Sequence, residues 1–422
     1  MSKHSHHSIK INLRKCIGCV RCMKDCPTKA IRVRKNKARI TYERCVDCGE
    51  CLRVCPHNAV EPIVTQSADL KKYAFKVALP SPVCYSQFGA HITPAAILSA
   101  ISSIGFDHVY DEALMCEMIS ASIEQYLDEH KSPRPIISSI CPVVVRLIQR
   151  LFPSLCRLII PIEPPREMAA KNLRKEIAEK HKIPADSIGI IHITPCAAKM
   201  VSINYPETME RSHLDGAIPI QMIYNKVMMK IKKEARSSFL DTGRPVSGIG
   251  IGWSMAGGES RSLKYFHSIS VSGVYDTIKI LEDVESGKLR DIEYLECLIC
   301  PDGCIGGPLT VENRFIAQSN INRLIRIYGS KKTVDVHTVR RLYKERYFLF
   351  EHSVEPKPFP GFDQDRSEAI KVLNKKNKIM KKLPGKDCGA CGAPDCSTLA
   401  EDIALNNASL QDCIYNKGDM HG

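Results

Sequence analysis

Short apolar runs alternate with helical patterns through the middle of this 422-residue chain. Apolar residues spaced three and four positions apart predict helices over residues 94–104 and 166–181. Four other runs are short, continuous and rich in β-branched residues, as buried strands are. They cover residues 75–79, 136–140, 188–194 and 217–220. Because alternating strands and helices are typical of α/β layers, an α/β domain is predicted over residues 73–350.

The two ends of the chain follow other patterns. Residues 30–34 and 38–42 alternate between apolar and polar side chains, which predicts a short hairpin within a domain at 1–62. Repeated prolines mark residues 351–367 as a linker. A small separate module is predicted after it, at residues 368–422.

The net charge of +14 is concentrated at the amino-terminal end. Residues 1–60 contain 14 lysines and arginines against 4 acidic residues. A basic surface of this kind attracts acidic proteins or nucleic acid. Aromatic residues make up only 6% of the chain and no nucleic-acid-binding motif is present, so we expect an electron carrier as partner and no nucleic acid.

The sequence shows no sign of export or of membrane insertion. The first residues contain no apolar signal core. The longest apolar stretch, residues 135–162, is interrupted by Arg146, Arg150 and Arg157, so we expect no membrane span. The twenty cysteines therefore favour metal binding in a reducing cytoplasm over a secreted disulfide scaffold.

Two cysteine runs of identical spacing lie near the amino terminus. Each reads C-x2-C-x2-C-x3-C-P, over residues 16–27 and again over residues 45–56. One tight loop can supply three corners of a cubane cluster, and the fourth thiolate must come from elsewhere. The runs resemble those of bacterial two-cluster ferredoxins, in which the last cysteine of each run serves the other cluster. A pair of zinc sites built from the C-x2-C halves is the alternative.

The ferredoxin resemblance implies a ferredoxin-like fold for residues 1–62, with two 4Fe–4S clusters. It also implies two sets of four ligands. The first set is Cys16, Cys19, Cys22 and Cys55. The second set is Cys45, Cys48, Cys51 and Cys26.

A further cysteine group stands at the carboxyl terminus, spaced C-x2-C-x4-C-x16-C. A basic helix predicted over residues 369–383 precedes it, and a helix over residues 397–409 would bring the last cysteine back to the others. The group resembles a small 4Fe–4S module of several anaerobic redox proteins, and a zinc ribbon is the alternative. The implied ligands are Cys388, Cys391, Cys396 and Cys413.

The most informative cysteines come from three distant segments, residues 137–142, 194–199 and 296–307. They are Cys141, Cys196, Cys300 and Cys304. Lys199 follows the second of them by three residues. A core cysteine or a surface lysine would be an ordinary explanation for any one of these residues. Together, in this order and with neighbouring prolines, they resemble the active-site domain of the iron-only (FeFe) hydrogenases over residues 80–347.

This resemblance implies a two-lobed α/β hydrogenase large-subunit domain that holds an H-cluster. That cofactor joins a 4Fe–4S cubane to a binuclear iron unit with carbonyl and cyanide ligands. By motif matching, Cys141, Cys196 and Cys300 hold the cubane. Cys304 bridges to the binuclear iron, and Lys199 binds a cyanide. Further matched positions at the cofactor are Ser139, Ile140, Pro195 and Leu298.

The cofactors expected from all three groups are therefore the H-cluster and three additional 4Fe–4S clusters. Active members of the hydrogenase family also have a cysteine immediately before the first ligand, and its thiol relays protons. Here that position is Ile140, which has no exchangeable side-chain proton. The other departures are Thr194 and Leu298 for methionines, Ser202 for a glutamate, and Ser86 and Gln87 for an acidic pair. The usual proton path is thus interrupted at its inner and its outer steps.

Four cysteines lie outside the three groups. They are Cys84, Cys116, Cys156 and Cys297. Helical apolar patterns predict that Cys116 and Cys156 are core thiols. Cys84 precedes the missing acids and Cys297 lies within the third motif, so either is a candidate to replace the lost relay.

A retained cofactor with an interrupted proton path resembles the sensory branch of this family. We therefore expect slow interconversion of dihydrogen with protons and electrons, in a hydrogen or redox sensor in the cytoplasm of an anaerobe. The expected partners are a ferredoxin-like electron carrier or a signalling protein, and the hydrogenase maturation proteins. One alternative is a non-catalytic iron–sulfur protein without the binuclear unit. Another is an ordinary turnover enzyme with a different proton route.

Overall fold

The computed structural model describes residues 7–234, 247–264, 267–357, 359 and 366–416. Its internal contacts separate two compact units. The small unit combines Met1–Ile63 with Lys357–Gly422, and the large unit is Val64–Pro356.

A four-stranded parallel sheet lies in the large unit. Its strands are β5 (Phe75–Pro80), β6 (His108–Val109), β8 (Ile188–Thr194) and β9 (Gly216–Pro219). They stand in the order β6–β5–β8–β9, and β5 pairs with β8 from Phe75 opposite Ile188 to Pro80 opposite Ile193. Three of the four predicted strands are thereby confirmed, although β9 begins one residue before its predicted start.

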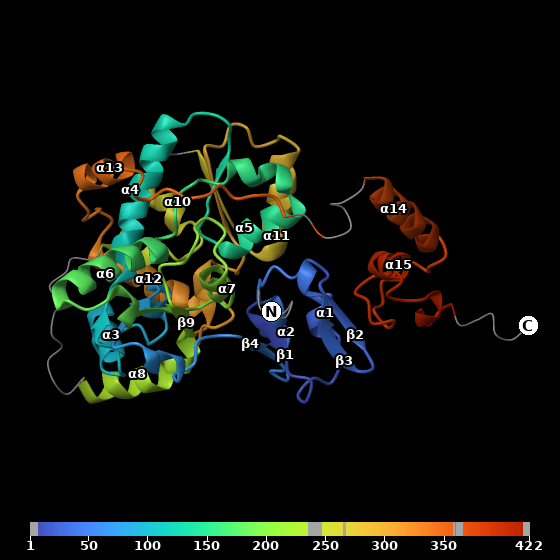
Figure 1. The fold of residues 1–422 in the computed structure, drawn as a ribbon, viewed down its shortest axis with the longest axis horizontal. Coiled ribbons are helices and arrows are strands. Elements are labelled where there is room, and N and C mark those ends of the chain that lie inside the picture. The colour runs from blue at the N-terminus through green and yellow to red at the C-terminus, as the bar shows by residue number, and fades with distance from the viewer. Residues whose placement is uncertain (1–6, 235–246, 265–266, 358, 360–365, 417–422) are drawn as a thin grey trace, which may run out of the picture. The chain divides into compact units, whose positions relative to one another are not determined.

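The large unit also contains eleven α-helices in its described residues, most of them labelled in Figure 1. In chain order they are α3 (Pro94–Ser102), α4 (Glu112–Glu129), α5 (Pro142–Leu151), α6 (Pro165–His181), α7 (Ala198–Asn204), α8 (Ile220–Glu234), α9 (Gly248–Gly252), α10 (Gly258–Ser262), α11 (Val274–Glu285), α12 (Arg314–Tyr328) and α13 (Val336–Lys344). The helices predicted over residues 94–104 and 166–181 are confirmed as α3 and α6. Within the part of the chain that the structure describes, no helix is both long enough and apolar enough to cross a membrane.

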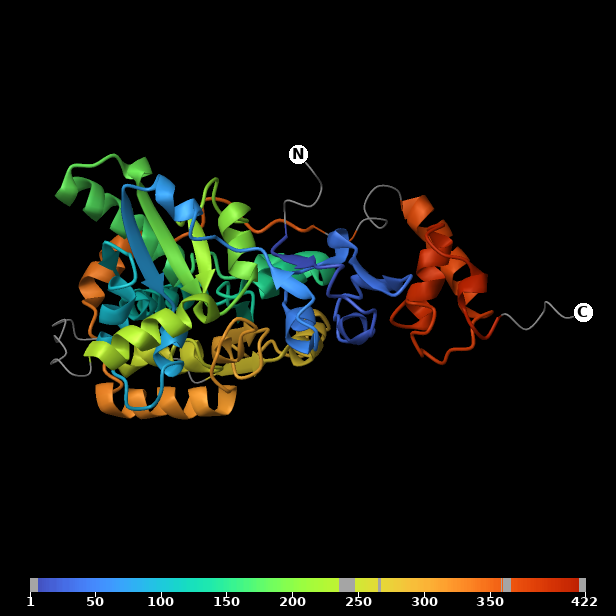
Figure 2. The same ribbon diagram turned by 90° about the horizontal axis from the view of Figure 1, so that it is seen from below.

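Both faces of the four-stranded sheet are buried, which explains why β5 and β8 are apolar at nearly every position. Val77 and Ile190 belong to one hydrophobic cluster, together with side chains of α4 and α6. Ala78 and Ile191 belong to a second cluster, together with side chains of α3 and α8. Helices α3 and α8 lie side by side (Figures 1 and 2).

A second sheet in the large unit is also parallel. Its strands, in spatial order, are β10 (Ser268–Ser272), β11 (Tyr294–Leu298) and β7 (Ile136–Ile137). The strand predicted over residues 136–140 is shorter than expected, because the chain leaves the sheet after Ile137. The hydroxyl of Ser139 then donates to the carbonyl of Ile162 at 2.6 Å.

The parallel strands deliver the three cysteine segments from their carboxyl ends. Cys196 lies just after β8, Cys300 just after β11, and Cys141 a few residues after β7. In open α/β sheets, ligands bind outside the carboxyl ends of the strands. Each segment therefore begins where the fold presents residues to a ligand.

The small unit begins with two antiparallel strand pairs and two short helices (Figure 1). The elements are β1 (Ile9–Ile11), α1 (Arg21–Lys24), β2 (Ile31–Arg34), β3 (Lys37–Ile40), α2 (Glu50–Val54) and β4 (Val60–Pro62). Strand β1 pairs with β4, and β2 pairs with β3 as the predicted hairpin. The helices α1 and α2 occupy equivalent positions in the two cysteine runs and contain Cys22 and Cys51.

The carboxyl-terminal part of the small unit contains α14 (Arg366–Met380) and α15 (Cys396–Ala404). The first was predicted three residues later, and the second was predicted to continue to residue 409. Helix α15 ends earlier because Asn406 has a positive φ of 60° and Asn407 N donates to Asp402 O at 2.7 Å. The chain then turns back and leads to Cys413. This return of the last cysteine to the others was predicted.

Candidate metal centres

The first predicted ligand set comes together in the small unit. Burial, and then the nearby thiols of Cys16, Cys19, Cys55 and Cys26, raise the pKa of Cys22 to about 12. Such effects arise between groups only a few Å apart. The last cysteine of the second run therefore lies near Cys22 of the first run, and so does Cys26.

All four cysteines of the second predicted set line one small hollow. Burial raises the pKa of Cys48 and of Cys51, and the Cys26 thiol raises both pKa values further. Backbone N–H groups also point at sulfur in both halves. Ala30 N lies 3.2 Å from Cys26 Sγ, and Ala59 N lies 3.2 Å from Cys55 Sγ. Four thiols around one hollow, with amide donors at sulfur, match the donor set of an iron–sulfur cluster.

The carboxyl-terminal cysteines also gather. Burial raises the pKa of Cys391, and among its neighbours Cys388 and Cys413 raise it as well. Cys396 and Cys413 belong to the same buried cluster, against which Cys391 packs. The amide of Cys396 is held by Asp387 Oδ1 at 2.7 Å. The predicted ligand set of this module is therefore in one place.

In the large unit, backbone hydrogen bonds fix the three motif segments. Cys141 caps the amino-terminal end of α5, and Cys196 N donates to Thr194 Oγ1 at 3.1 Å. The amide of Cys304 donates to Ser254 O at 2.8 Å, which joins the third motif to residues 254–256.

Gly303 lets these two segments approach closely. Its φ is +89°, and a Cβ at this position would lie 2.4 Å from Ala256 N. A side chain would therefore push the segments apart, and glycine is the residue that tolerates this backbone conformation. The buried carboxylate of Glu296 holds the same region by accepting from Gly257 N at 3.0 Å and Ser260 N at 2.8 Å.

The motif thiols converge on Lys199. The pKa of Cys304 is raised to about 12: burial is the largest cause, the charge of Lys199 opposes the rise, and the thiols of Cys141 and Cys196 add to it. Burial also raises the pKa of Cys196, again against Lys199. Cys300 is also buried and lies four residues before Cys304 in the sequence. The structure thus brings distant parts of the chain together around one ammonium group.

Beside these thiols lies a small cavity. Four of the predicted site residues line it: Ile140, Lys199, Leu298 and Cys304. Ser139 lines a neighbouring pocket instead. Pro195 lines neither, and its carbonyl accepts from Leu309 N at 3.0 Å.

Lys199 is the clearest indication of what the cavity binds. Its side chain is buried, and among the described residues its Nζ has no hydrogen-bond or ion-pair partner. Two further donors at the cavity, Ser254 Oγ and Arg166 Nε, are buried and likewise unpartnered within the described ranges. An unpaired buried ammonium is costly, so the cavity is suited to an anionic ligand. Cysteine thiolates beside such a cavity fit a cluster that carries anionic ligands.

Several cavity residues were missed by the sequence analysis. They are Glu112, Cys116, Arg166, Ser254 and Glu259. Glu259 directly follows two glycines of the glycine-rich segment 248–258, and this position was a usable signal. Cys116 is in the core, as its helical pattern predicted, and it also lines the cavity.

Glu259 is held as a neutral acid. Its oxygens lie 2.8 Å from Ser138 Oγ and 2.7 Å from Tyr294 OH. Burial, and then the charge of Glu296, raise the pKa of Glu259 to about 8. Glu259 therefore keeps its proton at pH 7, at the wall of the cavity.

The buried His192 is neutral. Its Nε2 lies 3.0 Å from Glu112 Oε2, and burial lowers the pKa of His192 to about 4 in spite of that carboxylate. The ring therefore acts as a hydrogen-bond donor to Glu112 at pH 7. The cations that act on the Glu112 carboxylate are then Lys199 and Arg166.

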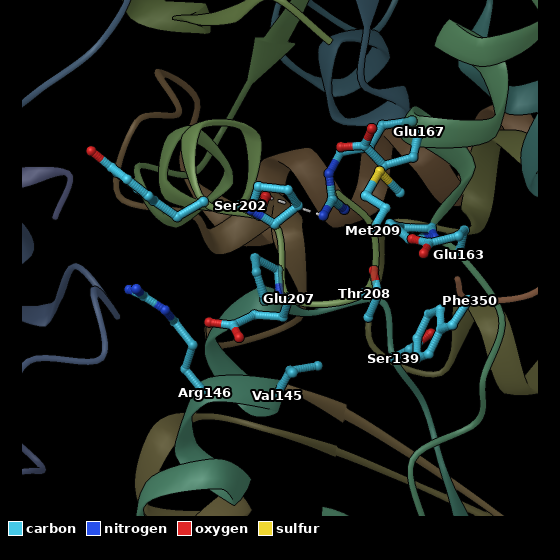
Figure 3. A pocket seen from close by; sticks show the side chains of 15 residues that line it. Ser139, Val145, Arg146, Glu163, Glu167, Ser202, Glu207, Thr208, Met209 and Phe350 are labelled. Atoms are coloured by element: carbon cyan, nitrogen blue, oxygen red, sulfur yellow. Dashed lines mark hydrogen bonds between the residues drawn. The ribbon is translucent and has the colours of Figure 1, made fainter. Parts of the chain in front are cut away.

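Arg166 lines both this cavity and a second pocket. Figure 3 shows the second pocket, with Glu163 and Ser202 among the side chains that line it. The guanidinium of Arg166 donates to Ser202 Oγ at 3.3 Å, the position where a glutamate was expected. Glu163 lies in the same pocket, and burial raises its pKa to about 7. Groups with exchangeable protons thus line both pockets.

The other departures have structural roles. Gln87, at the expected acidic pair, accepts from Val311 N at 2.8 Å and from Glu312 N at 3.0 Å. Cys84 and Cys297 are fully buried, and burial raises the pKa of each thiol. Neither of them lines the cavity, whereas Cys116 does.

Family comparisons match each of the three cysteine groups. The model of the iron-only hydrogenase large subunit, C-terminal domain, matches residues 74–235 and 254–308. A 4Fe–4S dicluster domain matches residues 8–56. An iron–sulfur cluster family matches residues 383–415.

Individual relatives are distant. The periplasmic [Fe] hydrogenase large subunit of Nitratidesulfovibrio vulgaris is 28% identical over 220 residues, which are 48% of this chain and 52% of the relative. The NADP-reducing hydrogenase subunit HndD of Solidesulfovibrio fructosivorans is 22% identical over 260 residues, 50% of this chain and 44% of the relative. The chain thus spans about half the length of these curated relatives. The solved [FeFe]-hydrogenase HydA1 of Chlamydomonas reinhardtii matches 69% of this chain and 97% of its own, with 16% identity and a TM-score of 0.48.

The raised pKa of Glu259 predicts a pH dependence of stability. Folded Glu259 keeps a proton up to about pH 8, whereas an unfolded glutamate releases it near pH 4.5. Stability should therefore fall as pH rises between these values, by up to about 1.4 kcal/mol per pH unit for one proton. Glu259→Gln cannot ionise and should lose less stability than the native protein between pH 5 and pH 8.

Urea unfolding followed by the fluorescence of Trp253, the single tryptophan, measures this difference in the large unit. Glu345→Gln, an exposed glutamate paired with Arg341, is the control and should follow the native protein. Equal pH slopes for native protein and Glu259→Gln would contradict the neutral state of Glu259.

Proposed function

The chain belongs to the family of the iron-only hydrogenase large subunit, C-terminal domain, and on that premise we propose that it interconverts dihydrogen with two protons and two electrons. We further propose that it does so slowly, as a hydrogen or redox sensor. The observation that carries the proposal is Lys199, buried without a partner among the described residues, beside motif thiols from three segments.

The chain's own residues would hold the cofactor. Cys141, Cys196 and Cys300 would bind the cubane, and Cys304 would join it to the binuclear iron. When bound, the binuclear unit supplies the site at which dihydrogen is split or formed. Lys199 would donate to a cyanide ligand, which gives the buried ammonium its anionic partner. Ile140 and Leu298 line the cavity with apolar surface and would exclude water from it.

We infer slow turnover because the usual proton path lacks its titratable side chains. A proton relay needs a titratable group within hydrogen-bond reach of the reacting atom. Ile140 stands at the position where active relatives carry the relaying thiol. Ser202 is engaged with Arg166, and Gln87 is engaged with backbone amides. Cofactor binding would thus be retained while the usual delivery of protons is absent, as a sensor requires.

Electrons would reach the site through iron–sulfur clusters in the other parts of the chain. We propose three 4Fe–4S clusters, two in residues 1–62 and one in residues 368–422. The hydrogenase part would be residues 73–350, followed by a linker at 351–367. A ferredoxin-like carrier or a signalling protein would exchange the electrons, and maturation proteins would load the binuclear iron in the cytoplasm.

An alternative function is that of an iron–sulfur protein without the binuclear unit. The cysteines alone fit this function, because a cubane would satisfy them. The unpartnered Lys199 favours the hydrogenase, because a cubane held by cysteines leaves the cavity without a cyanide for that ammonium to bind. Iron content separates the two: four cubanes contain sixteen irons, and a binuclear unit adds two.

The infrared spectrum of the protein matured with hydrogenase maturation proteins tests the proposed function. We expect bands of metal-bound carbonyl and cyanide in the native protein, and two irons more than in the unmatured protein. Lys199→Met should lose or shift the cyanide bands, because the hydrogen bond that polarises this ligand is removed. Lys332→Met is the matched control, since Lys332 pairs with Glu124 at 2.9 Å and does not line the cavity. Absence of all such bands from the matured native protein would contradict the hydrogenase function.

A second candidate, a turnover enzyme with a different proton route, is favoured by two cavity residues. Cys116 is a buried thiol whose pKa is raised by burial, and Glu259 is a neutral acid at pH 7. Both side chains therefore hold a proton at the cavity wall. Neither residue belongs to the motif that supplies the proton-relaying thiol in active relatives. Either could deliver a proton where Ile140 cannot.

Hydrogen-evolution rates decide between sensor and turnover enzyme. The turnover enzyme predicts a native rate on the order of 10 per second or more. It also predicts a loss of 10²-fold or more in Cys116→Ala or Glu259→Gln, the typical contribution of a general acid. The sensor predicts a slow native rate that changes little in either variant. Cys156→Ala, which removes a thiol away from the cavity, should behave like the native protein in both cases.

A further inference from the structure

Within the small unit, the carboxyl-terminal module (residues 366–416) contacts the dicluster segment (residues 7–63) through opposite charges. Arg32 makes a two-pronged pair with Asp402, with Nε–Oδ2 at 2.6 Å and Nη2–Oδ1 at 2.8 Å. Both side chains are only 12% exposed. A bidentate, largely buried pair of this kind is among the stronger charged contacts in proteins.

Further cations of the dicluster segment join the contact. Arg44 pairs with Glu401, and Lys29 pairs with Asp395 at 2.7 Å. The guanidinium of Arg34 donates to the carbonyl of Cys391. These residues belong to the basic amino-terminal segment, which we expected to attract an acidic electron carrier.

The main chains also meet. Val33 N, on β2, donates to Gly392 O at 2.9 Å, so the module adds a hydrogen bond to the edge of the hairpin. A Cβ on Gly392 would lie 1.8 Å from Val33 O, and its φ is +79°. Only glycine allows this approach, so the contact depends on a residue inside the module's own cysteine motif.

The contact brings cysteine-bearing loops together. Gly389 lies between Cys388 and Cys391, and a Cβ there would lie 2.7 Å from Lys24 Cε and 3.2 Å from Met23 Cε. Met23 and Lys24 in turn lie between Cys22 and Cys26, which belong to the two different ligand sets of the dicluster segment. The loop of the third set therefore touches a segment that serves both other sets.

We propose that the carboxyl-terminal module is a built-in electron partner of the dicluster segment, docked on the basic face formed by Lys24, Lys29, Arg32, Arg34 and Arg44. One electron leaves the reduced cluster of one part and enters the oxidised cluster of the other, with no bond broken and no proton moved. The module occupies the face that would attract an acidic carrier, so an external carrier is excluded from it.

This docking is independent of the hydrogen chemistry proposed for the large unit. It rests on contacts between two parts of the small unit, and it requires iron–sulfur clusters but no binuclear iron. Protein with its iron–sulfur clusters but without the binuclear unit is therefore sufficient for the test. A failed hydrogenase proposal would leave this inference standing, and the reverse also holds.

Charge reversal tests the docking in the full chain. Asp402→Arg should separate the two parts, because it places two cations face to face. Hydrogen–deuterium exchange at the Val33 amide should then become roughly tenfold faster or more, since a charged hydrogen-bonded contact is lost. In the electron paramagnetic resonance spectrum of the reduced protein, spin coupling between the third cluster and the dicluster segment should disappear. Arg32→Asp combined with Asp402→Arg should restore both signals.

Glu61→Arg is the matched control, because Glu61 pairs with Lys10 and Lys15 inside the dicluster segment. It should leave the Val33 exchange and the spin coupling unchanged. Arg32→Asp alone repeats the disruption without altering the module, in case Asp402→Arg lowers the iron content. Unchanged exchange and coupling in Arg32→Asp, or no recovery in the double variant, would overturn the proposal.

Discussion

One buried charge explains how the large unit is built. Lys199 lies in the large unit beside thiols from three remote segments, and among the described residues its ammonium has no partner. A buried ammonium without a hydrogen-bonded partner is costly. A fold that retains it gains from an anion bound in the adjacent cavity, and this requirement links the cysteine ligands, the cavity and the proposed chemistry.

The rest of the large unit serves to bring those segments to the same place. Parallel strands end just before Cys196 and Cys300, and Gly303 allows the third motif to pack closely on residues 254–256. Glu296 accepts hydrogen bonds from backbone amides of this region, and Glu259 is hydrogen-bonded at the wall of the cavity. The small unit follows a similar logic, because opposite charges and one glycine seat its carboxyl-terminal module on the dicluster segment.

Local patterns in the sequence were sufficient for the cysteine groups, for the central strands and for the hairpin, because spacing and apolar runs are local properties. Polar contacts between residues that are far apart in the sequence leave no such local pattern. Cys116 has the pattern of an ordinary core residue, and nothing near Arg32 in the sequence indicates Asp402. The early end of β7 was not predicted for the same reason: beyond the strand, the hydroxyl of Ser139 donates to the carbonyl of Ile162, which is distant in the sequence.

Crystallography of the matured protein at the iron absorption edge addresses the central claim most directly. Anomalous density locates iron without assumptions about ligands. We expect a four-iron peak enclosed by Cys141, Cys196, Cys300 and Cys304, and a separate two-iron peak in the cavity with Lys199 Nζ at hydrogen-bond distance from one of its ligands. An iron-free cavity in protein whose maturation is otherwise complete, or Lys199 paired with a protein carboxylate instead, would contradict the account.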